Sequence, residues 1–352
     1  MKPISNLSDA EDFAALDVPS IDVPVPAFES LTVMLTELCN LDCWMCDFAV
    51  SKGLREQLPW ASEDFIGFIS HPFFDRLHSI GFTGGEPFAH SDVLSLYAAL
   101  VQARPKLFFS FSSNASLIKP MVDALACTRD WNRFKLFTSI DGVETHDVQR
   151  GRLGALQKSL GNIEILRRHY PKLTVEVKFT VTPVNHHELL SAYRLITSHG
   201  LDFTAKMIEV NPNYTSQLSF DKHSESFRFT PAQIDVVRRQ LDTMLSEPVQ
   251  VSLRRLAEMT ELRESLEPDW GRSGHCKLPS SGAFLDSRLR LFTCKEYAPV
   301  LDLSRQSLDD LLCSKAYAAV HRAEQENVEA CTRCTSQLKM TARKPGWLRW
   351  FE

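Results

Sequence analysis

The sequence lacks the features that mark membrane, secreted and nucleic-acid-binding proteins. Its 352 residues include no apolar run long enough to span a bilayer, and Met1 does not begin a signal peptide. Positive charge is in deficit: the net charge is −5, whereas a surface that binds nucleic acid is strongly basic. The 9 cysteines are too sparse for a disulfide scaffold. We therefore expect a cytoplasmic protein with no membrane and no nucleic-acid partner.

Length and composition are those of a globular chain with a large core. At 44% hydrophobic residues, the chain suits one large domain and a smaller one. We predict five segments: an acidic N-terminal leader (1–28), an α/β domain (29–210), a helical bridge (211–270), a cysteine-containing domain (271–340) and a C-terminal tail (341–352). The bridge should contain the helices Pro231–Leu245, capped by Thr230, and Val251–Leu266, which is strongly charged and solvated on one face.

Strand-like and helix-like stretches alternate through the α/β domain, as in parallel sheets whose strands are joined by helices. The predicted strands are Leu31–Thr36, Leu77–Phe82, Leu107–Ser112, Lys135–Ile140, Thr174–Thr182 and Phe203–Val210. The predicted helices are Ala61–Ser70, Asp92–Ala103, Ile118–Ala126, Leu153–His169 and His187–Ser198. Six such units are fewer than the eight of a closed barrel, so the fold class is α/β, a partial (β/α)6 TIM-like barrel followed by a small α+β domain. Chemistry in such barrels lies at the C-terminal strand ends.

Three cysteines follow the first predicted strand. Cys39, Cys43 and Cys46 are spaced as C-x3-C-x2-C. Thiolates on one tight loop can face a single point, as an iron–sulfur cluster requires, and three of them leave one iron of a four-iron cluster open. Three buried cysteines or a partial zinc site are the alternatives.

Glycines and short polar residues follow the next predicted strands. Paired glycines let a backbone approach a ligand closely, and a neighbouring carboxylate can hold an ammonium group. Short polar side chains at strand ends can bind a ribose or a carboxylate, although ordinary helix caps and Asx-turns use the same residues. The candidates are Gly84, Gly85, Glu86, Pro87, Ser112, Asn114, Ser139, Asp141 and Arg150.

A second set of cysteines lies near the C-terminus. Residues 282–292 alternate apolar and polar side chains around a turn, which predicts a β-hairpin with a cysteine near each end. Two cysteine pairs can close a metal site, and their spacing fits both zinc and a fully ligated iron–sulfur cluster. The four cysteines are Cys276, Cys294, Cys331 and Cys334.

The cysteine motif, with G-G-E-P about 40 residues later, resembles the radical S-adenosylmethionine (radical SAM) superfamily over roughly residues 30–335. That family usually has an aromatic residue just before the third cysteine, whereas this chain has Met45 there and Trp44 one place earlier. The resemblance implies a [4Fe–4S] cluster on the first three cysteines, with S-adenosyl-L-methionine (SAM) at its open iron. It also implies that G-G-E-P binds the amino group of SAM, and that Asn114, Ser139 and Arg150 contact SAM or substrate.

The second cysteine set resembles a twitch domain, the shorter relative of the SPASM domain. Its C-x17-C and C-x2-C spacings are similar to those of small dehydrogenases that act on aminocyclitol or sugar alcohols. The resemblance implies one auxiliary [4Fe–4S] cluster for electron transfer. It further implies cleavage of SAM to a 5′-deoxyadenosyl radical that abstracts hydrogen from substrate, with a flavodoxin- or ferredoxin-type electron donor.

These features predict a radical SAM oxidoreductase that oxidises a small molecule in a biosynthetic pathway. The main alternative is a peptide-modifying maturase that forms cross-links or epimerises residues, and a non-enzymatic zinc module would leave the glycines and Glu86 unexplained. Cys127 and Cys313 are expected to be buried, inert thiols, or else hydrogen-atom donors of an epimerase. The candidates for a proton-accepting base are Lys295, Glu296, Tyr297 and Glu209.

Overall fold

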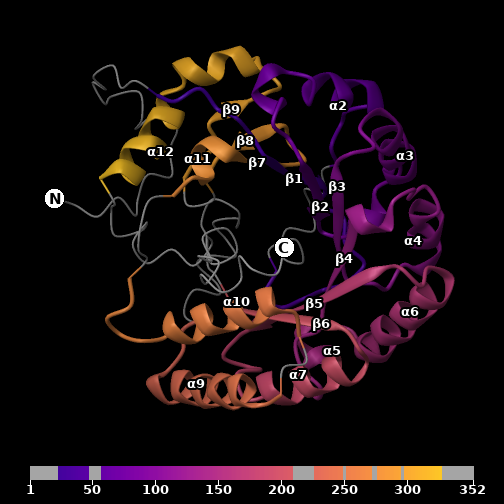
Figure 1. Ribbon diagram of the computed structural model, residues 1–352, viewed down its shortest axis with the longest axis vertical. Coiled ribbons are helices and arrows are strands. Elements are labelled where there is room, and N and C mark those ends of the chain that lie inside the picture. The colour runs from indigo at the N-terminus through magenta and orange to yellow at the C-terminus, as the bar shows by residue number, and fades with distance from the viewer. Residues whose placement is uncertain are drawn as a thin grey trace.

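A curved, mostly parallel sheet forms the centre of the computed structural model, which describes residues 23–46, 57–208, 226–248, 251–271, 276–294 and 297–326 (Figure 1). The strand order is β6-β5-β4-β3-β2-β1-β7-β8-β9. The first six strands are parallel and adjacent in sequence order: β1 (Ser30–Thr36), β2 (Ser79–Gly84), β3 (Phe108–Ser113), β4 (Phe134–Ser139), β5 (Thr174–Val181) and β6 (Asp202–Met207). The predicted α/β class is confirmed, and the arrangement is consistent with a partial TIM-like barrel.

Helices cover the outer side of this sheet (Figure 1). Aromatic side chains join the two layers: Tyr97 meets Phe109 and Phe111 edge-on, and Tyr193 meets Phe203 in the same way. Burial of each such ring contributes about 1.5–3 kcal/mol. The α-helices here are α2 (Ser62–Phe68), α3 (Val93–Ala103), α4 (Ile118–Leu125), α5 (His146–Gln149), α6 (Ala155–His169) and α7 (Leu189–Ser198). Short 3-10 helices are η2 (Pro72–Phe74), η3 (Pro87–Ala89) and η4 (Trp131–Arg133).

Two further helices follow β6: α9 (Pro231–Ser246) and α10 (Leu253–Glu264). The predicted cap of α9 is confirmed, because Thr230 Oγ1 accepts a hydrogen bond from the Gln233 amide. Helix α10 packs on the side of the sheet opposite the outer helices. The sequence did not predict this packing. Arg255 of α10 is buried between Glu176 of β5 and Glu258. Burial of these charges is tolerated because the guanidinium forms ion pairs with both carboxylates.

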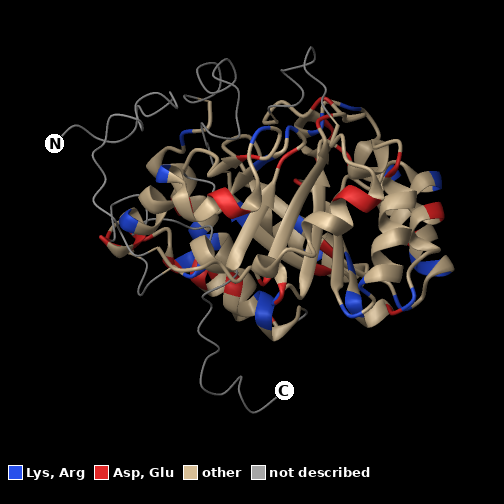
Figure 2. Cartoon of the chain, turned by 90° about the horizontal axis from the view of Figure 1, so that it is seen from above, with Lys and Arg blue, Asp and Glu red and all other residues tan. Residues whose placement is uncertain are grey.

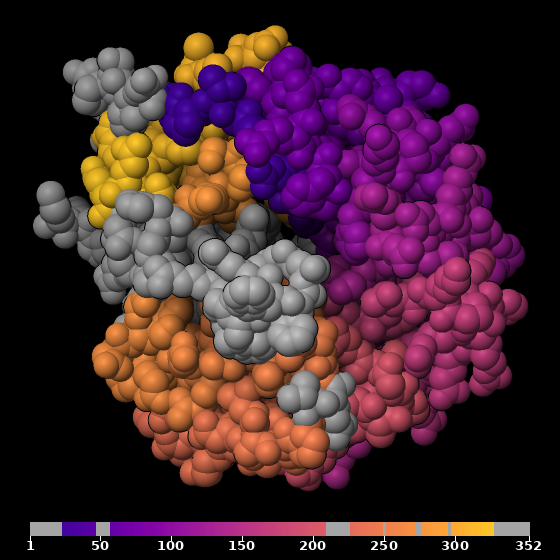
Figure 3. Space-filling model, in the orientation of Figure 1, coloured from indigo at the N-terminus to yellow at the C-terminus, as the bar shows by residue number. Residues whose placement is uncertain are grey.

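The predicted hairpin is confirmed as β7 (Gly282–Leu285) and β8 (Arg290–Phe292), followed by β9 (Leu301–Asp302). Unexpectedly, β7 pairs in parallel with β1, with Ser30 opposite Gly282, so the hairpin extends the large sheet. Figure 3 accordingly shows the indigo N-terminal residues beside the orange and yellow C-terminal ones. The helices of this region are α11 (Leu278–Ser281), η5 (Leu308–Cys313) and α12 (Lys315–Gln325).

The last residues of the predicted leader belong to the fold. Phe28 is fully buried, and the Ala27 amide donates to the Ser280 carbonyl at 2.9 Å. Tyr317 Oη donates to the Pro24 carbonyl at 3.2 Å. Backbone bonds to α11 and a side-chain bond to α12 thus fix this stretch. The boundaries assigned to the five segments remain predictions.

Along the chain drawn in Figure 2, Lys and Arg positions are interspersed among Asp and Glu positions. Within the described ranges, every helix is too short or too polar to span a lipid bilayer.

Candidate functional site

The cysteine loop, residues 39–46, leaves the C-terminal end of β1. Cys43 is buried, and Cys39 and Cys46 are half-buried. The Cys46 amide donates to the Cys43 carbonyl at 3.0 Å, which makes a tight turn. Burial raises the pKa of Cys39 to about 11, so this thiol needs a bound metal or a cation to become a thiolate. In the described part of the chain, no three His, Cys, Asp or Glu side chains surround a point that suits a single metal ion.

The paired glycines hold the start of this loop. The Gly85 amide donates to the Thr36 carbonyl and the Glu86 amide to the Leu38 carbonyl, both at 2.7 Å. A Cβ atom on Gly85 would lie 2.3 Å from the Leu38 carbonyl oxygen, and one on Gly84, at φ +146°, would lie equally close to that of Thr36. The lack of side chains at Gly84 and Gly85 therefore lets this backbone lie directly against the end of β1.

Glu86 links the ends of β2 and β3. Its buried carboxylate accepts hydrogen bonds from Ser113 Oγ and the Asn114 amide, each at 2.8 Å, and from the Phe88 amide at 3.2 Å. Burial raises the pKa of Glu86 to about 7, although these hydrogen bonds act in the opposite direction. Its contact with an ammonium group remains a prediction.

Asn114 reaches the cysteine loop from the end of β3. Its Nδ2 donates to Asn40 Oδ1 at 2.9 Å and lies 3.9 Å from Cys39 Sγ. Asn40 Nδ2 in turn donates to Ser116 Oγ at 2.7 Å. This network orients the loop. Asn40 and Ser116 carried no signal in the sequence, because their function depends on contacts between distant segments.

Arg150 directs a positive charge at the same loop. Its Nη1 lies 3.7 Å from Cys43 Sγ, and its Nη2 bonds to the buried carboxylate of Asp141. Burial alone would lower the pKa of Arg150, but Asp141 and Cys43 outweigh burial and raise this pKa. Hydrogen-bond donors aimed at cysteine sulfurs stabilise the negative charge of a thiolate-bound cluster. The three thiols and their two donors therefore fit an iron–sulfur cluster.

Residues 149–152, which we call the clamp, cover the outside of the loop. Gly151 has φ +62°, and a Cβ atom there would lie 2.2 Å from the Asp42 carbonyl oxygen. Arg152 Nη1 donates to the Asn40 carbonyl at 2.9 Å, and Trp44 Nε1 donates to Gln149 Oε1. The sequence predicted Arg150 from this stretch but missed its neighbours.

Two buried groups hold the segment that leads to the clamp. His146 Nδ1 accepts from the Asp141 amide at 3.0 Å, and burial lowers the pKa of His146 to about 3, so the ring is neutral. Glu188 accepts from the backbone amides of residues 143–145. A neutral ring and a carboxylate that receives several amides fix the path of this segment.

Ser112 and Ser139 lie at the C-terminal ends of β3 and β4, on the face of the sheet opposite the outer helices. Lys178 Nζ approaches Ser112 Oγ at 3.5 Å and lies 3.7 Å from the centroid of the Phe137 ring. Ser139 is opposite Lys178 in the β4–β5 register. Ser112, Ser139 and Lys178 thus lie near one another on three neighbouring strands, and contacts of the two serines with SAM or substrate remain predictions.

Half of the second cysteine set lies in the described ranges. The Cys276 amide donates to Glu324 Oε1 of α12 at 2.7 Å. Continuing the register of Phe284 with Phe292 places Cys294 opposite the first residue of β7. The other two members, Cys331 and Cys334, lie outside the described residues.

The predicted catalytic residues are spread over several places. Tyr297 is half-buried against the core, and Cys127 is half-buried at the end of α4 in the outer layer. Cys313 is exposed at the end of η5, so the expectation of burial is wrong for this residue; its helix is a short 3-10 turn with one apolar side. The remaining candidates, Lys295, Glu296 and Glu209, lie outside the described residues.

Comparison with known proteins identifies the region that contains this site. A sequence model of the radical SAM superfamily matches residues 33–196. An AdoMet-dependent heme synthase of Methanosarcina barkeri is 30% identical over 174 residues, which are 47% of this chain and 46% of that protein. The sporulation killing factor maturation protein SkfB of Bacillus subtilis is 27% identical over 171 residues, 48% of this chain and 39% of that protein. The chain thus spans less than half the length of either relative.

A solved structure supports the same fold. SuiB of Streptococcus suis, bound to S-adenosylmethionine, superposes with a TM-score of 0.61 at 14% identity, over 84% of this chain and 68% of that one. The superposition covers more of this chain than the segment matched by the superfamily model.

Proposed function

Residues 33–196 are a radical SAM domain, and from this premise we propose that Cys39, Cys43 and Cys46 hold a [4Fe–4S] cluster that binds SAM. The bound pair would supply one-electron cleavage of SAM to methionine and a 5′-deoxyadenosyl radical, which takes a hydrogen atom from substrate. The main support for this proposal is that Arg150 donates toward Cys43 Sγ and Asn114 donates toward Cys39 Sγ.

Residues of this chain would position the cluster and SAM and shield them from solvent. The clamp lies over the cysteine loop, and the bond from Trp44 to Gln149 closes it on one side. Substrate would lie against the inner face near Ser112 and Ser139. Holding a substrate C–H bond against one reactive carbon replaces a random encounter with a fixed geometry.

We further propose that Cys276, Cys294, Cys331 and Cys334 hold an auxiliary [4Fe–4S] cluster in a twitch-type unit. Support comes from the hairpin: β7 begins opposite the first residue of β1, so Cys276 and Cys294 belong to the N-terminal edge of the sheet. The cysteine loop leaves the other edge. The 7 residues of β1, at about 3.3 Å each, separate the two edges by roughly 20 Å. An auxiliary cluster there would accept an electron from a substrate radical and complete an oxidation.

The substrate we propose is a small molecule in a biosynthetic pathway, and the enzyme would be cytoplasmic. A peptide substrate is the second candidate, and the similarity to a killing factor maturation protein favours it. Either reaction would use the same radical, so the two candidates differ only in what binds at the inner face and in the fate of the substrate radical.

Iron and sulfide analysis after anaerobic reconstitution tests the two clusters. We expect about eight irons per chain in the wild type and about four in a Cys39/Cys43/Cys46→Ala variant, because each four-iron cluster depends on its own cysteines. A Cys127→Ala variant is the matched control and should keep all eight. Four irons in the wild type and none in the variant would contradict the auxiliary cluster, and equal contents in both would contradict the first cluster.

A further inference from the structure

The turn of the β7–β8 hairpin, residues 286–289, lies at the strand end from which the cysteine loop leaves. Strands β7 and β1 run parallel, with Leu285 opposite Val33, so the turn that follows β7 is at the C-terminal end of β1. Ser287 Oγ lies 3.9 Å from Met34 Sδ, close to that end. A turn from the C-terminal part of the chain therefore adjoins the start of the cysteine loop.

An ion pair joins this turn to the chain just before the loop. Arg288 Nε donates to Glu37 Oε1 at 3.0 Å, and Arg288 Nη2 donates to Glu37 Oε2 at 3.2 Å. Both carboxylate oxygens are thus held, and the Glu37 side chain is only 11% exposed. Glu37 is two positions before Cys39, which is at most ~7 Å along the backbone. Dissolved ions screen a charge only partly at that distance, because the Debye length is about 10 Å at 0.1 M salt.

The hydrogen bonds of the turn keep Arg288 in this position. The buried carboxylate of Asp286 accepts hydrogen bonds from the Arg288 and Arg290 amides at 3.0 and 2.8 Å, and from Arg290 Nε at 2.7 Å. Leu289 has φ +64°, a left-handed conformation in which a leucine is rare. Such conformations persist only where the surrounding structure imposes them, and they are frequent at functional sites. The backbone on both sides of Arg288 is therefore fixed.

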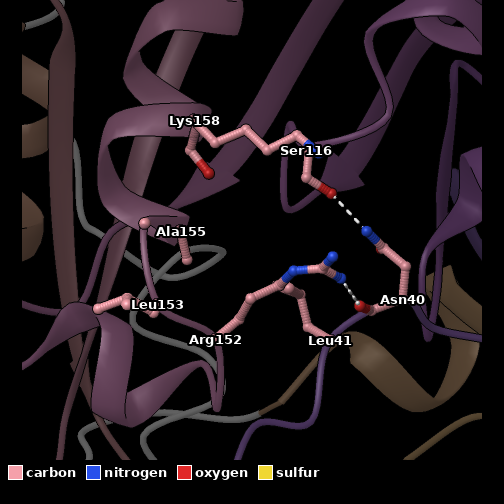
Figure 4. Close-up of a pocket in the computed structure, with 9 residues that line it drawn as sticks. Asn40, Leu41, Ser116, Arg152, Leu153, Ala155 and Lys158 are labelled. Carbon is pink, nitrogen blue, oxygen red and sulfur yellow. Dashed lines mark hydrogen bonds between the residues drawn. The ribbon is translucent and has the colours of Figure 1, made fainter.

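Arginines hold the chain on both sides of Cys39, and the two contacts differ in charge. After Cys39, Arg152 Nη1 donates to the Asn40 carbonyl, and Figure 4 shows its guanidinium directed at that residue beside a small pocket. This contact orients an uncharged peptide group. Before Cys39, Arg288 neutralises the carboxylate of Glu37. In the absence of Arg288, the negative charge of Glu37 would add to that of thiolates bound to a cluster on the same loop.

We propose that Arg288 is a positioning residue whose charge, by neutralising Glu37, makes the cluster on the cysteine loop easier to reduce. The inference rests on the proposed function, because it requires that cluster. Reduction transfers one electron from an external reductant to the cluster, and no covalent bond changes. Nearby negative charge repels this electron. A Glu37 carboxylate that has lost Arg288 therefore lowers the reduction potential, and an Arg288 guanidinium that has lost Glu37 raises it.

A redox titration of the reconstituted protein with titanium(III) citrate, followed by electron paramagnetic resonance, tests this role. SAM can bind only at an open iron, so the signal that changes when SAM is added reports the cluster on the cysteine loop. The variants are Arg288→Gln, Glu37→Gln and Glu37→Gln/Arg288→Gln. Arg290→Gln is the matched control, because Arg288 and Arg290 are both 39% exposed and each pairs with a largely buried carboxylate.

We expect the equilibrium constant for reduction to fall about 10-fold in Arg288→Gln, which corresponds to about 59 mV for one electron. Glu37→Gln should shift the potential in the opposite direction, and the double variant and Arg290→Gln should keep the wild-type value. Loss of a purely structural contact would move both single variants in the same direction, so opposite shifts identify an effect of charge.

Unchanged potentials in both single variants would overturn the inference. Shifts of the same sign in these two variants, or an equal shift in Arg290→Gln, would also overturn it. If Arg288→Gln binds no iron, the sign of the shift in Glu37→Gln decides. A wild type whose iron–sulfur signal does not respond to SAM contradicts the proposed function instead.

Discussion

Alanine at Gly85 is expected to destabilise the protein by about 3 kcal/mol, as forced overpacking does, and to remove the iron held by the cysteine loop. Its Cβ would lie 2.3 Å from the Leu38 carbonyl oxygen and 2.7 Å from that of Glu37. Both neighbours are backbone atoms, so they can move only if the end of β1 moves. Such a shift also breaks the hydrogen bond from the Gly85 amide to Thr36 and displaces the first cysteine.

Gly161→Ala separates this effect from a general response to the loss of a glycine. Gly161 lies inside α6, and a Cβ atom there would meet nothing within 4 Å. Alanine in a helix interior stabilises by roughly 0.5–1 kcal/mol relative to glycine. Chemical denaturation and iron content of the two reconstituted variants give the comparison. A Gly85→Ala protein with the stability and iron content of the wild type would show that the strand ends do not hold the loop in this way.

Removal of Arg255, which bonds to Glu176 near the start of β5, should have a comparable effect on stability. Its guanidinium bonds to Glu176 and Glu258, and all three side chains are almost completely buried. Lys135 Nζ also lies near this cluster, 3.3 Å from Glu176. Breaking a buried ion pair by removing one partner typically costs about 3–5 kcal/mol, because the remaining charge stays desolvated. We therefore expect Arg255→Ala to lower the free energy of unfolding by that amount.

The neighbouring Arg254 provides the matched control. It approaches the same carboxylate, Glu258, at 3.3 Å, but its side chain is 61% exposed. Exposed ion pairs contribute about 0–1 kcal/mol, so Arg254→Ala should be nearly neutral. Urea denaturation of both variants measures the difference. Equal losses for the two arginines would mean that α10 does not bury Arg255 against the sheet.

The sequence predicted well those features that depend on local pattern. The strand expected at Leu31–Thr36 is β1, and the helix expected at Leu153–His169 is α6 from Ala155 onward. The cap at Thr230 and the hairpin around residues 286–289 were also predicted, because capping and turn residues act within a few positions. The position of the cysteine loop at a strand end follows from the same alternation.

Features that depend on contacts between distant segments were not predicted. The pairing of β7 with β1 joins residues about 250 positions apart, and no periodicity encodes it. Charged residues in α10 indicated solvent exposure, whereas Arg255 is buried because Glu176 lies opposite. The glycines of G-G-E-P indicated approach to a ligand, and the structure adds their contact with the end of β1.

In the candidate site, too, local motifs were predicted from the sequence and contacts between distant segments were not. Motif spacing indicated the three cysteines and Arg150, but not the partners that orient them. Asn40 and Gln149 function through bonds to Asn114 and Trp44, which come from other strand ends. A sequence pattern names the groups that carry chemistry, and the fold supplies the side chains that hold those groups in place.

The central claim is that the cysteine loop holds a cluster that cleaves SAM. Its most direct test is 5′-deoxyadenosine formation by the anaerobically reconstituted protein with SAM and dithionite. We expect product from the wild type and none from the Cys39/Cys43/Cys46→Ala variant, which loses the ligands of that cluster. Product from the variant, or an iron-loaded wild type that forms no 5′-deoxyadenosine, would contradict the claim.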